Sequence, residues 1–231
     1  MSNTLQTQTM HPGFALGAAE RNKVLRNTYW LLALSMLPTV AGAWLGVATG
    51  MVSGMTGGVG AIVFLAGAFG FMFAIEKTKN SAAGVPVLLA FTFFMGLMLS
   101  RLVGMVLGLA NGAGLIMTAF AGTGLIFLGM ATMSSVIKRD LSSMGKWLMI
   151  GTIMLIVAGI ANIFLQSSAL MLTLSVLSIG IFSAFILHDL KRVQDGHESN
   201  YISATLGVYL SLYNVFQSLL MLLGVLGGRD E

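Results

Sequence analysis

The sequence contains seven stretches of about 20 predominantly apolar residues, separated by short polar or charged segments. A helix of that length crosses the roughly 30 Å hydrocarbon core of a bilayer, because each residue adds about 1.5 Å. Lipid offers the backbone no hydrogen-bond partner, and no stretch alternates as a barrel strand does, so all seven are expected to be helices. We therefore predict an all-α integral membrane protein, a seven-transmembrane helix bundle. The predicted spans are about Tyr29 to Ala48, Gly57 to Ile75, Val85 to Leu107, Ala113 to Val136, Trp147 to Leu165, Ala169 to Leu187, and Tyr201 to Leu226.

The composition supports this fold class. Hydrophobic residues make up 56% of the chain and charged residues only 9%, whereas soluble domains have about 25% charged residues. There is no cysteine, which excludes disulfides, thiolate metal sites and catalytic thiols. The net charge of +4 does not indicate a nucleic-acid partner, because the basic residues lie in short loops between apolar stretches. The surrounding partner is membrane lipid.

The positions of the basic residues predict the orientation. Short loops that carry lysine and arginine remain in the cytoplasm. Ten of the 12 basic residues fall before the first span or after the second, fourth and sixth spans, and the loops around Val52, Asn111 and Gln166 carry no charge. We predict a multi-pass protein of the bacterial inner (cytoplasmic) membrane, with the N-terminus in the cytoplasm and the C-terminus outside. The ten residues are Arg21, Lys23, Arg26, Lys77, Lys79, Lys138, Arg139, Lys146, Lys191 and Arg192.

The spans divide the chain into three parts. Residues 1–27 form a polar tail, which we expect to be flexible and cytoplasmic; it either gives a partner something to hold or has no role. It is not a cleavable signal peptide, because the first apolar stretch begins late and is too long. Residues 28–227 form the membrane domain, and residues 228–231 a short external tail.

Small residues predict close helix packing inside this domain. Three pairs of glycines have four-residue spacing, which lets helix backbones approach closely in a bilayer. We expect these contacts within one chain, and the sequence leaves the oligomeric state open. The pairs are Gly42 and Gly46, Gly104 and Gly108, and Gly224 and Gly228.

Ionisable residues within or beside the spans are functional candidates, because a charge is costly in a bilayer. Arg101 lies near the outer interface, where it is either an anchor whose head reaches water or part of a gate with a C-terminal carboxylate. Glu76 and Asp189 close inner helix ends, where a carboxylate faces the negative end of the helix dipole. Asp189 therefore needs a partner: His188, the following basic residues, or polar groups on the last span. The alternative for both carboxylates is simple solvation from the cytoplasm.

The last span is the most polar of the seven. Gly207, Ser211, Asn214 and Ser218 recur every three or four residues and so share one helix face. Such a helix belongs inside the bundle, where its polar groups either join helices or border a hydrated path. The candidate residues on this span are Tyr209, Ser211, Tyr213, Asn214, Gln217 and Ser218.

Enzymatic and metal chemistry find little support. None of the three histidines, His11, His188 and His197, lies deep in a span, and no zinc-type spacing is present. A nucleophile elbow is absent, and Ser211 with His188 is the only conceivable serine–base couple. We predict that the protein is not an enzyme and has no resident cofactor.

Four segments resemble a known family. FAGTGLIFLGMATMSS, residues 120–135, and the following KRDLSSMGKW resemble the fourth span and loop of the Bax inhibitor family, in particular its bacterial YccA branch. FILHDLKRVQDG, residues 185–196, and NYISATLGVYLSLYNVFQSLL, residues 200–220, are similar to the closing two helices of that family. The resemblance covers about residues 20–227 and implies a seven-helix bundle with the last helix at its centre.

The resemblance also implies two activities. The YccA branch is similar to modulators of the membrane-bound AAA protease FtsH, which bind it and restrain degradation of membrane proteins; this is our leading hypothesis. Other members resemble pH-sensitive calcium leak channels closed by a pair of aspartates. Asp189 matches the first aspartate, but the second falls on Ser211, and a shared proton needs two carboxylates. The alternative hypothesis is thus a calcium or cation leak gated near Asp189, with transient Ca²⁺. A purely structural role in a membrane complex is the third.

Overall fold

The structure, a computed structural model, describes residues 17–52 and 57–228. Its seven helices are α1 (Ala18–Thr49), α2 (Gly57–Thr78), α3 (Gly84–Leu107), α4 (Gly112–Val136), α5 (Met144–Leu165), α6 (Ser168–Gln194) and α7 (Tyr201–Gly227). Each is long and apolar enough to cross a membrane. The predicted all-α seven-helix class is confirmed.

Two helices continue beyond the predicted spans. α1 begins at Ala18 rather than near Tyr29, so the end of the predicted flexible tail is helical. α6 likewise continues past Leu187 to Gln194. Hydropathy finds only the part of a helix that lies in lipid, which explains why both polar extensions escape it. The tail residues 1–16, with His11, and the terminal residues 229–231 lie outside the described residues.

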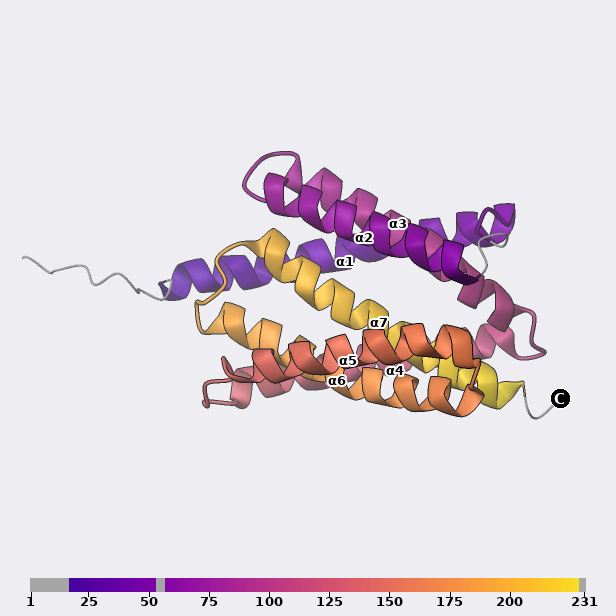
Figure 1. Cartoon of the computed structure of the whole chain (residues 1–231). Coiled ribbons are helices and arrows are strands. Elements are labelled where there is room, and N and C mark those ends of the chain that lie inside the picture. The colour runs from indigo at the N-terminus through magenta and orange to yellow at the C-terminus, as the bar shows by residue number, and fades with distance from the viewer. Residues whose placement is uncertain (1–16, 53–56, 229–231) are drawn as a thin grey trace, which may run out of the picture.

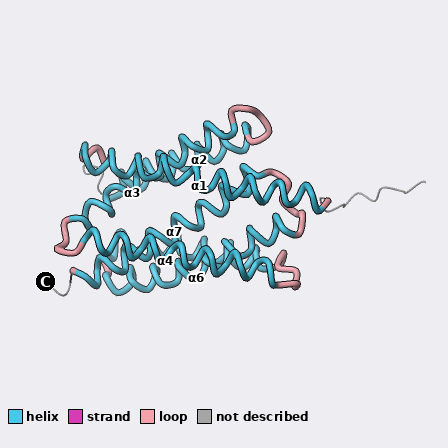
Figure 2. Tube along the Cα trace, turned by 180° about the vertical axis from the view of Figure 1, so that it is seen from behind, coloured by secondary structure: helices cyan, strands magenta, loops and turns pink. Residues whose placement is uncertain are grey.

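The last helix lies at the centre of the bundle. α1, α2 and α3 lie on one side and α4, α5 and α6 on the other, with α7 running between them (Figure 1 and Figure 2). α7 packs against α1, α2, α3, α4 and α6, whereas α5 packs against α6 and has no buried residue. The predicted central position of the final helix is therefore confirmed.

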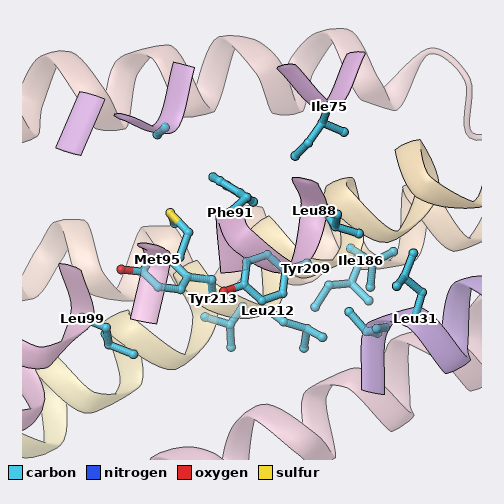
Figure 3. Packing of buried hydrophobic residues seen from close by; sticks show 14 of the residues in the cluster. Leu31, Ile75, Leu88, Phe91, Met95, Leu99, Ile186, Tyr209, Leu212 and Tyr213 are labelled. Atoms are coloured by element: carbon cyan, nitrogen blue, oxygen red, sulfur yellow. The ribbon is translucent and has the colours of Figure 1, made fainter. Parts of the chain in front are cut away.

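The buried core surrounds two aromatic residues of α7. Figure 3 shows Tyr209 and Tyr213 between Phe91 and Met95 of α3 and Leu212 of α7. The rings of Phe91 and Tyr209 meet edge to face, 6.1 Å apart between centroids. Because lipid is as apolar as these side chains, close packing and hydrogen bonds, rather than the hydrophobic effect, hold such helices together.

Glycines allow α1 and α3 to approach closely. A Cβ on Gly42 would overlap the carbonyl oxygen of Phe93, and one on Gly96 would overlap the carbonyl oxygen of Thr39. At Gly46 the added atom would meet the Ser100 side chain. Gly42 and Gly46 thus make contacts within one chain, as the spacing predicts. At Gly104 the helices are less close, because an added Cβ would come no nearer than 3.9 Å to Val47 of α1, an ordinary contact.

Basic helix ends gather at one end of the bundle. Arg21 Nη1 donates to the carbonyl of Gln194 at 2.9 Å, which joins the start of α1 to the end of α6. Asn200 caps α7 through its side-chain oxygen and donates from Nδ2 to the carbonyl of Lys79 at 3.1 Å, which adds the end of α2. Gly228 lies by Leu109 at the opposite end. The described chain therefore enters and leaves at opposite ends (Figure 1).

Candidate functional site

Asp189 is wedged between its neighbour on α6 and the backbone of α7. Its side chain is 17% exposed, and its Oδ1 lies 3.2 Å from Nδ1 of His188. A Cβ on Gly207 would come within 2.8 Å of Asp189 Oδ2, so the carboxylate would have to shift if residue 207 carried a side chain. Of the partners that the sequence offers for Asp189, the structure places His188 and the backbone of the last helix beside it.

The basic residues that follow Asp189 pair elsewhere. Lys191 Nζ donates to Asp195 Oδ1 at 2.7 Å, and Arg192 Nη2 lies 3.6 Å from Glu198 Oε2. These cations lie in the last turn of α6, where they offset the negative end of the helix dipole. Neither cation forms an ion pair with Asp189.

A narrow crevice lies beside His188, between the end of α6 and the loop from α4 to α5. It has no room for a water molecule. Hydrogen bonds from the hydroxyl and the backbone N–H of Ser142 hold the pKa of Asp140 below its usual value. Within residues 17–52 and 57–228, no group of three histidine or carboxylate side chains could hold a metal ion. The crevice is lined by Asp140, Leu141, Ser142, His188, Lys191, Arg192, Asp195 and His197.

Ser211 is buried one helical turn beyond Gly207 on α7. Asp189 contacts Gly207, and no hydrogen bond joins Asp189 to Ser211 in the described part of the chain. The structure therefore brings Asp189 and His188 together but leaves Ser211 one turn away. No hydrogen bond joins Ser211 to His188 among the described residues.

The other polar residues of α7 make helix-joining or internal bonds. The Tyr209 hydroxyl lies 2.8 Å from Thr39 Oγ1 of α1 and 3.4 Å from the carbonyl oxygen of Thr92 of α3. Ser218 Oγ donates to Ser178 Oγ of α6 at 2.9 Å.

Asn214 and Gln217 behave differently from these two. Asn214 Nδ2 donates to the carbonyl of Leu210 in its own helix at 2.8 Å, and Gln217 is half-buried. Of the two roles considered for the polar residues of α7, helix joining is supported by Ser218 on the predicted polar face and by Tyr209 on the opposite side of the helix.

Sequence reasoning missed four residues of this arrangement. Thr39 and Thr92 are single threonines in apolar spans, and Ser178 is one of several serines on α6, so nothing local marks them. Gly207 is missed as a contact of Asp189 because a glycine has no side-chain functional group that would mark it. Both contacts of α6 with α7 fit one antiparallel register of the two helices. In that register Asp189 lies opposite Gly207 and Ser178 lies opposite Ser218, so a prediction of antiparallel pairing could have identified both.

Glu76 and Arg101 lie far from Asp189. Glu76 is 65% exposed and accepts from Lys79 Nζ at 2.6 Å, as expected of a solvated carboxylate at a helix end. Arg101 is exposed on α3 toward the uncharged end, which fits an anchor at that interface. The alternative gate would use Asp230 or Glu231, which lie outside the described residues.

These features define a polytopic α-helical membrane protein whose most polar helix is enclosed by its companions, with one carboxylate held at the basic end. The family model described as the inhibitor of apoptosis-promoting Bax1 matches residues 21–228. The chain therefore belongs to this family, the Bax inhibitor family. Its bacterial relatives include YccA.

Three relatives show how closely the chain is related to bacterial members. The modulator of FtsH protease YccA of Escherichia coli strain K12 is 38% identical over 203 residues, which cover 88% of this chain and 90% of that protein. An uncharacterized membrane protein of Vibrio cholerae is 37% identical over 212 residues, or 91% and 93% of the two chains. A protein of Neisseria meningitidis serogroup A is 38% identical over 213 residues, or 91% and 94%. The similarity runs through the whole membrane domain.

Proposed function

We propose that this protein is a non-enzymatic modulator of the membrane-bound protease FtsH in the bacterial inner membrane. The observation that carries the proposal is the 38% identity, over nearly the whole chain, to a relative named as such a modulator. The basic residues support an orientation in which the N-terminus is cytoplasmic and the C-terminus external. Restraint of proteolysis would then come from helix contacts in the bilayer and from the N-terminal segment on the cytoplasmic side.

The packing at Asp189 supports a partner-binding role over a conducting one. A leak needs a hydrated path past the gate, whereas Asp189 touches Gly207 and the crevice at His188 has no room for water. The resemblance to calcium leak channels implies a pair of aspartates, and Ser211 occupies the position of the second one. This chain therefore lacks the second carboxylate of such a gate. The bonds of Tyr209 and Ser218 to neighbouring helices point the same way.

The test is co-purification and substrate turnover in cells. Tagged full-length protein extracted in mild detergent should bring FtsH with it, and overexpression should lengthen the half-life of a membrane substrate of FtsH. Deletion of residues 1–16 leaves α1 intact and should weaken the restraint. The proposal fails if FtsH stays behind and substrate half-life is unchanged.

A calcium leak is the second candidate, favoured by one observation, the semi-buried pair of His188 and Asp189 at a helix end. Purified protein in liposomes loaded with a calcium dye measures it directly. Flux that changes between about pH 6 and pH 8 and is altered by Asp189→Asn, but not by Asp195→Asn, would establish the leak. Absence of flux, or flux indifferent to Asp189→Asn, removes it.

A further inference from the structure

The first turns of α1 form a groove that no part of the proposed function uses. Its volume is about 480 Å³, and it is lined by Asn22, Leu25, Arg26, Tyr29 and Trp30. These residues follow the spacing i, i+3, i+4, i+7 and i+8, so they share one face of α1. The groove is open to its surroundings rather than enclosed, so a ligand in it would stay partly exposed.

The groove lies at the level of the membrane interface. Its polar end belongs to the turn in which Arg21 bonds the end of α6, at the basic end of the bundle. Trp30, at its other end, is 73% exposed, and tryptophan and tyrosine collect where headgroups meet acyl chains. The Tyr29 ring meets Phe127 of α4 edge to face at 6.0 Å, so this residue of the groove also packs against a neighbouring helix.

The two ends of the groove differ in chemistry. Arg26 is exposed and takes part in no ion pair with the described residues, and Asn22 adds an amide donor one turn before it. A guanidinium binds phosphate oxygens through paired N–H groups. Leu25, Tyr29 and Trp30 provide an apolar wall beside these donors.

The geometry points to a binding site for one anionic phospholipid in this groove. The lipid phosphate accepts hydrogen bonds from Arg26 and Asn22, and the first part of an acyl chain lies along Leu25 and Trp30. Free phosphate would gain nothing from the apolar wall. A zwitterionic lipid brings a cationic headgroup that Arg26 repels. The site is independent of any partner protein.

Trp30 reports on this site directly. The chain has three tryptophans, and Trp44 and Trp147 are both exposed, so W44F/W147F leaves Trp30 as the only tryptophan, excited selectively above the tyrosine absorption, with little effect on packing. This protein is reconstituted in phosphatidylcholine vesicles that contain a small fraction of brominated phosphatidylglycerol or brominated phosphatidylcholine. Quenching by phosphatidylglycerol should indicate about fivefold enrichment near Trp30, the factor expected from one basic side chain at a membrane surface.

Matched variants separate a site from general charge attraction. Arg26→Gln should remove the preference for phosphatidylglycerol, and Asn22→Asp, which places a carboxylate in the groove, should lower it too. Lys23→Gln removes the same charge from α1 outside the groove and should keep most of the preference. Helix content by circular dichroism and unchanged quenching by brominated phosphatidylcholine show that each variant is folded.

Three results would overturn the site. Equal quenching of the parent protein by the two lipids means that no anionic lipid is selected. An equal loss in Lys23→Gln and Arg26→Gln means that the attraction is diffuse. Loss of the preference in excess inorganic phosphate, at constant ionic strength, means that the groove binds a free anion and not a lipid.

Discussion

The phenol oxygen of Tyr209 lies 2.8 Å from Thr39 Oγ1, so a bond between two side chains joins the last helix to the first at the centre of the bundle. The same hydroxyl lies 3.4 Å from the carbonyl oxygen of Thr92, which adds the third helix. Tyr209 is buried, and water cannot replace these partners. This polar residue of α7 therefore holds three helices of the bundle together.

Tyr209→Phe should destabilise the protein by about 1 kcal/mol, because side-chain bonds between membrane helices contribute roughly 0.6 to 1.7 kcal/mol. Reversible unfolding in mixed micelles with increasing SDS measures the change. Tyr213→Phe is the control, since the Tyr213 hydroxyl makes no hydrogen bond within the described residues. An equal loss in both variants would show that the ring environment, and not the hydroxyl bond, matters.

Gly96→Ala should separate α1 from α3 and cost about 1 to 3 kcal/mol, the usual range for overpacking. The added methyl would meet the carbonyl of Thr39 in the facing backbone, which cannot turn aside. Gly104→Ala on the same helix has free space and should be neutral or stabilising by up to about 1 kcal/mol through helix propensity. Unfolding midpoints in SDS compare the two, and similar midpoints would contradict the close contact.

Ser178 and Ser218 should be energetically coupled by about 0.6 kcal/mol, the mean value for such bonds in a bilayer. A double-mutant cycle of Ser178→Ala and Ser218→Ala isolates this interaction from the loss of each hydroxyl alone. Strict additivity of the two single variants would mean that the bond contributes nothing.

Asp140 should titrate below pH 3.8, because Ser142 donates two hydrogen bonds to its charged form. A carboxyl with a folded-state pKa below its unfolded value contributes stability that is complete above the unfolded pKa and is lost as the pH falls through the folded one. The ordered turn between α4 and α5 should therefore persist above about pH 4 and loosen on further acidification.

Carbon-13 NMR of aspartate carboxyls, assigned with Asp140→Asn, gives the Asp140 pKa. Ser142→Ala removes the side-chain donor but keeps the backbone N–H, so the midpoint should move toward 3.8 without reaching it. An unchanged midpoint would show that the Ser142 hydroxyl is not the main cause.

Much of the fold follows from the sequence because a bilayer imposes length, helicity and charge placement on every span. The polar face of α7 predicts its enclosed position for the same reason. The early start of α1 at Ala18 does not follow, since a polar helical extension beyond the hydrocarbon core does not raise the hydropathy that defines a span. Helix boundaries outside lipid depend on local contacts such as the bond from Arg21 to Gln194.

The candidate site is less accessible to sequence reasoning. Asp189 and His188 are adjacent in the chain, so their pairing follows easily. Two other contacts depend on which helices touch and in which register. They are the contact of Asp189 with Gly207 and the bond between Tyr209 and Thr39. Apolar spans do not specify that register, because any two of them are equally compatible with lipid.

The enclosed helix α7 follows the other six described helices in the chain, so it is synthesised after them. Until then Thr39 and Thr92 lack their contacts with the Tyr209 hydroxyl. A chain truncated before Tyr201 retains six membrane anchors but lacks the interior about which they assemble. Assembly of the bundle therefore requires α7, because its Tyr209 hydroxyl joins α1 and α3.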